Sequence, residues 1–229
     1  MSMSTLGLPH RRTSWLRIFG TLALLLSQAA SGHSPPIPSW GGALQYRVHV
    51  NLTAHDVVKE GATWEFQYAF LSSQTMNVSR YDHRQGQRDE VCNSIKSGSN
   101  EPCTATHASD GWLYVAFPNS GSCCKCSQHI GPVRSDWLQD GGASYQGSSE
   151  VCGYKVDEWL KQGASDNHYY CTSDAAQKPV RYMEHKNNML KQWDFDLSTY
   201  IAGPIPEADS FFAPPADCTS RCRAAMCLF

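Results

Sequence analysis

Three cysteines and a histidine lie close together near the middle of the chain, at Cys123, Cys124, Cys126 and His129. Thiolate and imidazole groups at such spacing are suited to hold zinc or copper. The alternative is that the cysteines form disulfides, because an oxidised cysteine is no longer a metal ligand. Cysteines this close in sequence are seldom bridged to each other. We therefore predict that each of the three reaches a different distant segment, so that this stretch ties several parts of the chain together.

The cysteine count supports the disulfide interpretation. The chain contains 10 cysteines, an even number, and all of them follow residue 90, which is typical of a disulfide framework in an exported protein. The spacing does not define which cysteine pairs with which. The predicted framework contains Cys92, Cys103, Cys123, Cys124, Cys126, Cys152, Cys171, Cys218, Cys222 and Cys227.

The beginning of the chain has the layout of a secretory signal peptide. Arg11, Arg12 and Arg17 form a basic start, residues 18–26 are mainly apolar, and small residues follow. This order is that of a signal peptide, and the apolar run is shorter than the about 20 residues that span a bilayer. We predict that residues 1–32 are removed, that the mature protein is secreted and extracellular, and that it has no transmembrane segment.

The remaining chain divides into a short leader and one domain. Residues 33–43 are rich in Pro and Gly, which predicts an extended, mobile leader. Residues 44–229 are numerous enough to bury the core of one domain.

The formal charge of −2 becomes −5 without residues 1–32, because 16 basic and 21 acidic residues remain. A mildly acidic surface argues against nucleic acid as a partner. Asn51 and Asn77 begin sequons, so both are predicted to carry glycans.

Two further constellations could carry chemistry. Cleavage after Gly32 would place His33 at the N-terminus, and this single residue resembles the copper-binding terminus of secreted polysaccharide monooxygenases. The second copper ligand would then be a histidine such as His49, His55, His83 or His107.

Asp194 and Asp196 are two positions apart and would point the same way on a strand. They suggest a glycosidase pair, or a calcium site together with Glu207 or Asp209; the alternative is a solvated strand face. The chain has no nucleophile elbow, P-loop, dinucleotide fingerprint or zinc-protease motif. We therefore predict no catalytic site and no firm cofactor, with calcium as the one candidate.

Alternation of apolar and polar residues predicts mainly antiparallel β structure, with one large curved sheet. The predicted strands are 44–52, 64–70, 76–82, 112–117, 168–172, 180–184 and 192–200. Residues 152–160 fit a strand or a short helix, and residues 83–110 and 144–149 are predicted to be irregular. Short helical turns are predicted at 135–138 and around the last three cysteines.

One predicted strand has an unusually aromatic face. Trp64, Phe66, Tyr68 and Phe70 alternate with polar or small residues, and so they share one side of the strand. This face is either plain core or the wall of a cavity for an apolar ligand. If Asn77 and Ser79 point outward on the next strand, Met76, Val78 and Arg80 join the aromatic face, and Arg80 then needs a partner such as Asp82.

The order of landmarks along residues 64–222 resembles that of the ependymin-related secreted glycoproteins, in their divergent non-vertebrate form. The landmarks are the Cys-Cys-x-Cys loop, Asp136-Trp137-Leu138, Tyr145-x-Gly147, Trp159-Leu160-x-x-Gly163, Asn167-x-Tyr169-Tyr170-x-Thr172, Pro179-Val180, Asp194-Phe195-Asp196 with Ser198-Thr199-Tyr200, and Phe212-x-Pro214 before Cys218. The chain departs from the family by extra cysteines, including Cys222 and Cys227.

The resemblance implies a half-open antiparallel barrel like that of bacterial lipoprotein carriers, whose concave face binds a hydrophobic or lipid-like ligand. It also implies an association with calcium and with extracellular matrix. The leading hypothesis is thus a secreted, disulfide-stapled, non-catalytic glycoprotein that binds a hydrophobic small molecule or lipid. The alternatives are a matrix or adhesion protein in which the aromatic residues are only core, and a copper-dependent monooxygenase that uses His33.

Overall fold

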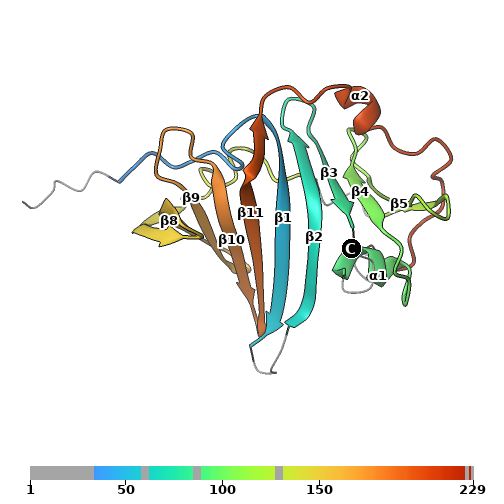
Figure 1. The fold of residues 1–229 in the computed structure, drawn as a ribbon, viewed down its shortest axis with the longest axis horizontal. Coiled ribbons are helices and arrows are strands. Elements are labelled where there is room, and N and C mark those ends of the chain that lie inside the picture. The colour runs from blue at the N-terminus through green and yellow to red at the C-terminus, as the bar shows by residue number, and fades with distance from the viewer. Residues whose placement is uncertain (1–33, 58–61, 85–88, 127–130, 225–226, 228–229) are drawn as a thin grey trace, which may run out of the picture. The chain divides into compact units, whose positions relative to one another are not determined.

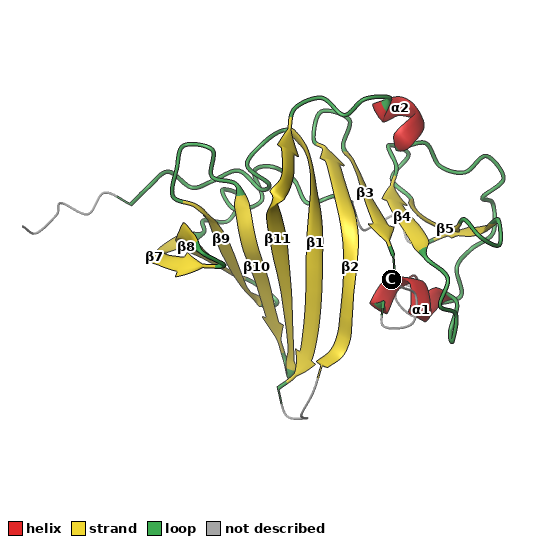
Figure 2. Ribbon diagram, viewed as in Figure 1, coloured by secondary structure: helices red, strands yellow, loops and turns green. Residues whose placement is uncertain are grey.

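A computed structural model describes residues 34–57, 62–84, 89–126, 131–224 and 227. Their main feature is one antiparallel sheet in the order β6-β5-β4-β3-β2-β1-β11-β10-β9-β8-β7. Two short helices accompany the sheet, as Figures 1 and 2 show. The elements are β1 (Gln45–Asp56), β2 (Ala62–Ser73), β3 (Val78–His83), α1 (Glu90–Ile95), β4 (Cys103–His107), β5 (Leu113–Phe117), β6 (Ser122–Lys125), β7 (Ser144–Val151), β8 (Tyr154–Gln162), β9 (Asp166–Thr172), β10 (Pro179–Lys186), β11 (Met189–Ala202) and α2 (Ala208–Phe211).

The sheet is open, since β6 and β7 form its two edges and do not pair with each other. The predicted fold class, a large antiparallel sheet with few helices, is confirmed. Residues 34–229 form one compact unit. The predicted signal peptide and His33 lie outside the described residues, so both stay predictions. No helix in the described part of the chain is long and apolar enough to cross a membrane.

Several local predictions were wrong for identifiable reasons. Residues 144–149, predicted to be a loop, belong to β7, whose side chains are mostly exposed because it is an edge strand and therefore lacks an apolar alternation. The stretch 83–110 contains α1 and β4; Asp89 caps α1 by accepting hydrogen bonds from the backbone of Val91 and Cys92. Residues 135–138 belong to a helical turn, as predicted, since Asp140 N donates to Asp136 O over 2.7 Å. The segment around Cys218 and Cys222, in contrast, is not helical.

The predicted side of Met76, Val78 and Arg80 was also wrong. Asn77 is exposed in the turn before β3, with a φ of 53°, so the alternation of β3 begins only at Val78. Ser79 is consequently buried rather than exposed. Pairing of Phe70 with Tyr81 and of Leu71 with Arg80 places the aromatic residues of β2 on one face and Val78 and Arg80 on the other.

We call the face that carries Tyr68 the inner face and the opposite face the outer face. On the outer face, Arg80 Nε donates to Asp82 Oδ1 over 2.7 Å, as the sequence suggested. The Arg80 guanidinium also lies 4.5 Å from the centre of the Phe211 ring and donates to the Phe211 carbonyl. Arg80 therefore holds α2 against the outer face instead of reaching a ligand on the inner face. Met76 packs with Val78 in the same outer cluster.

The leader is packed rather than mobile. Pro38 and Trp40 are buried, and the Trp40 backbone N–H donates to the carbonyl of Ser135 over 2.8 Å. The Trp40 ring lies 5.2 Å from the Tyr169 ring and 5.2 Å from the Tyr182 ring. A large aromatic side chain on an otherwise Pro- and Gly-rich segment is what fixes the segment, because its burial offsets the entropy of ordering.

The C-terminal tail closes the β6 edge through three disulfides. Cys123 pairs with Cys218, Cys124 with Cys222, and Cys126 with Cys227. The prediction that each of the three reaches a different distant segment was wrong, because all three bridges end on the same C-terminal tail. Cys123 packs with outer-face residues and Cys124 with inner-face residues. The tail is therefore bonded to β6 on both faces of the sheet. Between the bridges, Lys125 N donates to Ser220 O and Cys222 N to Lys125 O. This pairing covers part of an edge that would otherwise be open to other strands.

The disulfide prediction was wrong for Cys152 and Cys171. Cys92 pairs with Cys103, which completes four bridges, while Cys152 is an exposed free thiol and Cys171 a buried one. Cys171 lies in β9 within the core cluster that contains Trp159 and Tyr169. An even count of cysteines therefore overstated the framework by one pair.

The two free thiols are expected to react very differently with an alkylating reagent. Burial raises the pKa of the Cys171 thiol to about 12, so this group stays protonated and unreactive near neutral pH. Mass spectrometry after labelling of the folded protein at pH 8 should find Cys152 modified and Cys171 unmodified. Labelling in urea provides the control, in which both thiols react. Modification of Cys171 in the folded protein, or failure to label Cys152, would contradict this assignment.

Candidate functional site

A row of apolar, mainly aromatic side chains runs across most of the inner face. Residues that pair in adjacent antiparallel strands share a face of the sheet. Pairing connects Tyr145, Trp159, Tyr169, Tyr182, Trp193, Leu52 and Phe66, from β7 through to β2. Because these residues are far apart in the sequence, only the strand order brings them together.

The first cavity lies over the middle of this row. Its volume is about 150 Å³, comparable with apolar cavities that take up benzene or xenon. The floor consists of side chains from β2, β3, β10 and β11, and the cover comes from the leader and from a loop after β6. The lining residues are Trp40, Tyr68, Phe70, Tyr81, Val133, Trp137, Tyr182, Trp193 and Phe195.

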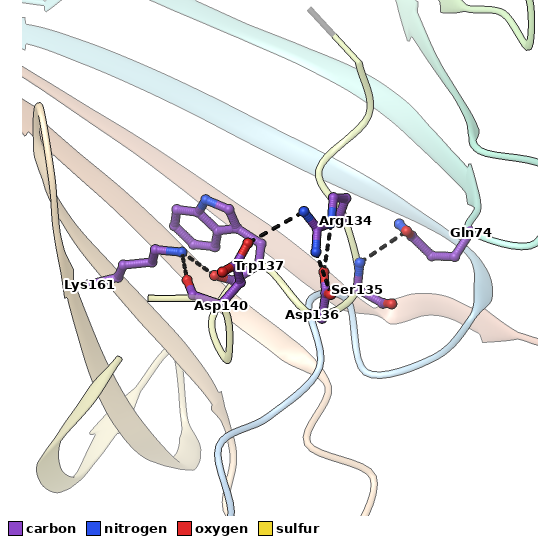
Figure 3. Close-up of polar contacts among 7 residues, drawn as sticks. All are labelled: Gln74, Arg134, Ser135, Asp136, Trp137, Asp140 and Lys161. Atoms are coloured by element: carbon purple, nitrogen blue, oxygen red, sulfur yellow. Dashed lines mark hydrogen bonds and ion pairs between the residues drawn. The ribbon is translucent and has the colours of Figure 1, made fainter. Parts of the chain in front are cut away.

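The covering loop, residues 131–142, is fixed at both ends by polar contacts (Figure 3). Near its start, Gln74 Nε2 donates to the Val133 carbonyl over 2.8 Å, and the Ser135 N–H donates back to Gln74 Oε1 over 3.0 Å. Near its end, Lys161 Nζ donates to the carbonyls of Trp137 and Asp140. These anchors hold Val133 and Trp137 above the aromatic row.

Lys161 is expected to be the main anchor of this loop. Its ammonium also lies 4.7 Å from the centre of the Trp137 ring, and hydrogen bonds from a charged donor contribute about 1.5–3 kcal/mol each. Lys161→Met should therefore speed hydrogen exchange in residues 135–142 by at least about tenfold, measured by mass spectrometry. Lys155→Met, at an exposed position of the same strand, is the control. Equal exchange in both variants would show that Lys161 does not anchor the loop.

The second cavity lies beside the first and is bounded on one side by α1. Its volume is about 210 Å³, and Tyr68, Tyr81 and Trp193 line both cavities. The ion pair between Glu90 of α1 and Lys191 of β11, at 2.7 Å, connects α1 to the centre of the sheet. The remaining lining residues are Leu52, Phe66, His83, Glu90, Val91, Ala105, His107 and Leu113.

The tyrosines in these linings are uncharged. Burial raises the pKa of Tyr68 well above its ordinary value, and it also raises the pKa of Tyr81 and of Tyr182. The first cavity has no charged side chain in its lining, whereas the second has Glu90, which is paired with Lys191. The cavities are therefore suited to an apolar ligand and not to a free ion.

The sequence identified part of this site. Phe66, Tyr68 and Phe70 line the cavities, while Trp64 packs on the same face but is not among the lining residues of either cavity. The sequence did not indicate the cover residues Trp40 and Trp137, because both lie in segments without a strand pattern. Nor did it indicate Tyr81, Tyr182 and Trp193 as lining residues, since their alternation identifies a face only after the register is known.

A third hollow lies on the outer face and is larger but more mixed. Its volume is about 400 Å³, and Ala69, Leu71, Ile201 and Phe211 line it together with Arg47, Val48, His49, Phe70, Asp82 and Thr199. Ile201 and Phe211 are exposed. Because Arg47 and Asp82 share its lining, this groove is a weaker candidate for an apolar ligand than the two cavities of the inner face.

The described residues do not bring the other candidate chemistry together. Asp194 is paired with Arg181 at 2.5 Å, whereas Asp196 accepts from the Ser198 hydroxyl over 2.6 Å, so the two carboxylates have separate partners. Two clusters within the described ranges have metal-ligand atoms close together, Cys126 with Cys222 and Cys227, and His83 with Asp89 and Cys92. All four of these cysteines are in disulfides, so neither cluster offers a thiolate. His129 lies outside the described part of the chain.

No protein-family model and no curated protein matches the sequence. Among solved structures, the fold is similar to an uncharacterized conserved protein from Thermus thermophilus, with a TM-score of 0.47 and 11% identity over 76% of this chain and 88% of that chain. It is also similar to a LolA superfamily protein from Nitrosomonas europaea, with a TM-score of 0.40 and 12% identity over 74% of this chain and 90% of the other. The lipoprotein LppX of Mycobacterium tuberculosis is similar over 66% of this chain and 84% of that chain, with a TM-score of 0.37 and 8% identity. At these scores the likenesses assign neither a family nor a ligand.

Proposed function

We propose that this protein binds a hydrophobic or lipid-like molecule in the two adjoining cavities of the inner face and performs no catalysis. The observation that carries the proposal is that aromatic-lined space lies on the inner face beside the leader, the loop 131–142 and α1, with Tyr68, Tyr81 and Trp193 shared by both cavities. In a plain core these side chains would meet at close packing. Taken together, the cavities fall within the about 300–1,000 Å³ of small-molecule sites.

The same proposal places the protein outside the cell. The disulfides require an oxidising compartment, and Asn51 and Asn77 are exposed, so both sequons are accessible to glycosylation. Membership of the ependymin-related family is part of the proposal, and its support is the order of landmarks in the sequence together with the open antiparallel sheet. The matrix and calcium associations of that family have no residue in the described structure to carry them.

Filling the second cavity is the sharpest test of binding. Ala105 lines this cavity, and Ala105→Leu should lower the affinity for an environment-sensitive apolar dye at least about tenfold, while stability stays within about 0.5 kcal/mol of wild type. If the aromatic face were only core, the larger side chain would instead cost about 1–3 kcal/mol by overpacking. Urea unfolding and dye titration of the same variant separate the two outcomes.

The matched control is Ala69→Leu, the same substitution on the outer face, where Ala69 lines the outer-face groove. This variant should bind the dye as wild type does. Loss of dye binding in Ala69→Leu, with normal binding in Ala105→Leu, would place the ligand on the outer face and would contradict the proposal.

A further inference from the structure

The second cavity contains a polar group that its apolar lining does not require. His83 lines this cavity and is buried, 4% exposed. Its ring lies among aromatic rings, 5.5 Å from Phe66 and 5.2 Å from Tyr68 between ring centres. The Nε2 atom of His83 is buried and has no hydrogen-bond partner among the described residues. A buried polar atom without a partner costs about 1–3 kcal/mol. A bound molecule that forms a hydrogen bond with Nε2 would remove this cost.

The neighbouring carboxylate determines which hydrogen-bonding role Nε2 has. Asp89 is fully buried, and its Oδ1 accepts from the backbone N–H groups of Val91 and Cys92 over 2.8 and 2.9 Å. Its Oδ2 lies 2.5 Å from His83 Nδ1. Since an ionised carboxylate only accepts hydrogen bonds, Nδ1 carries the hydrogen. In a neutral imidazole, Nε2 is then an acceptor.

We infer that His83 Nε2 is the polar anchor of the ligand and that it selects an apolar molecule with a hydroxyl group at one end, such as a long-chain alcohol. This inference rests on the proposed function. The hydroxyl donates to Nε2, and the hydrocarbon chain lies along Tyr68, Tyr81 and Trp193, which continue into the first cavity. A ligand that only accepts hydrogen bonds, such as an ether, places its lone pairs against those of Nε2 and binds less well.

An isosteric change at Asp89 tests the anchor by reversing its polarity. In Asp89→Asn, the amide oxygen still accepts from Val91 and Cys92, while the amide nitrogen takes the place of Oδ2 and donates to His83 Nδ1. The hydrogen of the imidazole must then move to Nε2, which becomes a donor. The variant therefore keeps the shape of the cavity and changes only the hydrogen-bonding role of His83 Nε2, from acceptor to donor.

The measurement is displacement of the apolar dye by 1-dodecanol and by dodecyl methyl ether, in the full-length mature protein. The ratio of the two affinities is compared between proteins, because the ether partitions more strongly into any apolar site. Relative to His83→Phe, which has no anchor, wild type should favour the alcohol by a further threefold to tenfold, the worth of one neutral hydrogen bond. In Asp89→Asn the ether should gain, and the ratio should fall to or below that of His83→Phe.

Each outcome decides the matter. Equal ratios in wild type and Asp89→Asn would overturn the anchor and leave the proposed function intact, because the dye would still bind. If His83→Phe does not fold, the comparison of wild type with the isosteric Asp89→Asn is sufficient. If the dye does not bind to wild type at all, the proposed function fails and the anchor fails with it.

Discussion

Trp40→Ala is expected to lower the free energy of unfolding by about 3–5 kcal/mol, the usual cost of removing a buried tryptophan side chain. Trp40 is 7% exposed and contacts Trp137, Tyr169 and Tyr182, with ring centres 5.2–5.5 Å apart. Its removal also opens the first cavity to solvent, since Trp40 is part of the cover. Dye affinity should therefore fall together with stability, measured by titration and urea unfolding.

Trp40→Phe is the control, because phenylalanine keeps an aromatic ring over the cavity and should cost clearly less than alanine. The prediction distinguishes a packed leader from the mobile leader that the Pro- and Gly-rich sequence suggests. Unchanged stability in Trp40→Ala would mean that residues 34–42 do not cover the inner face in solution.

Removal of the three tail disulfides is expected to have the largest effect on stability, and the effect should not be additive. The bridges Cys123–Cys218, Cys124–Cys222 and Cys126–Cys227 have sequence separations of 95, 98 and 101, so they close nearly the same loop. Any one pair changed to alanine should cost about 2 kcal/mol, because the other two keep the long loop closed. Removal of the last remaining pair should cost about 4.7 kcal/mol, the entropy of a loop of about 100 residues, which is about 2.7 kcal/mol more than the first.

Urea unfolding of the single-pair, two-pair and three-pair variants measures this series. The control is the Cys92–Cys103 bridge, which closes a loop with a separation of 11 and does not share it with the tail bridges. Its removal should cost the same in wild type and in a tail variant. Equal, additive losses for the three tail bridges would contradict the shared loop, and faster hydrogen exchange in β6 only after the last removal would support it.

The sequence predicted the centre of the sheet well, because β1 and β2 each have one solvent-exposed face and one buried face, which produces an alternating pattern. Tyr46, Val48, Val50 and Leu52 are buried, as their alternation indicated. The edges were harder to predict, since β7 has no buried face to produce a pattern. The error at Met76, Val78 and Arg80 arose from the sequon: a glycan requires an exposed Asn77, and Asn77 is exposed in a turn, so it says nothing of the side on which Ser79 lies.

The candidate site was only partly predictable for a related reason. The aromatic face of β2 was visible locally, whereas Trp193 stands beside Leu52 and Tyr182 beside Trp193 only through the register of β1, β10 and β11. The covers were not visible, because Trp40, Val133 and Trp137 lie in irregular segments. Their anchoring contacts, such as that of Gln74 with Val133, join residues that are far apart in the sequence. The tail cysteines were expected to be bridged, and their partners came from the fold.

Native mass spectrometry of the purified protein tests the central claim most directly. Wild type isolated without added ligand should carry one apolar molecule, released by organic solvent, with a mass that denatured protein lacks. Ala105→Leu, purified in the same way, should carry much less of it, and Ala69→Leu should carry as much as wild type. Wild-type protein with no bound molecule that also takes up no apolar probe would show that the aromatic inner face is only core.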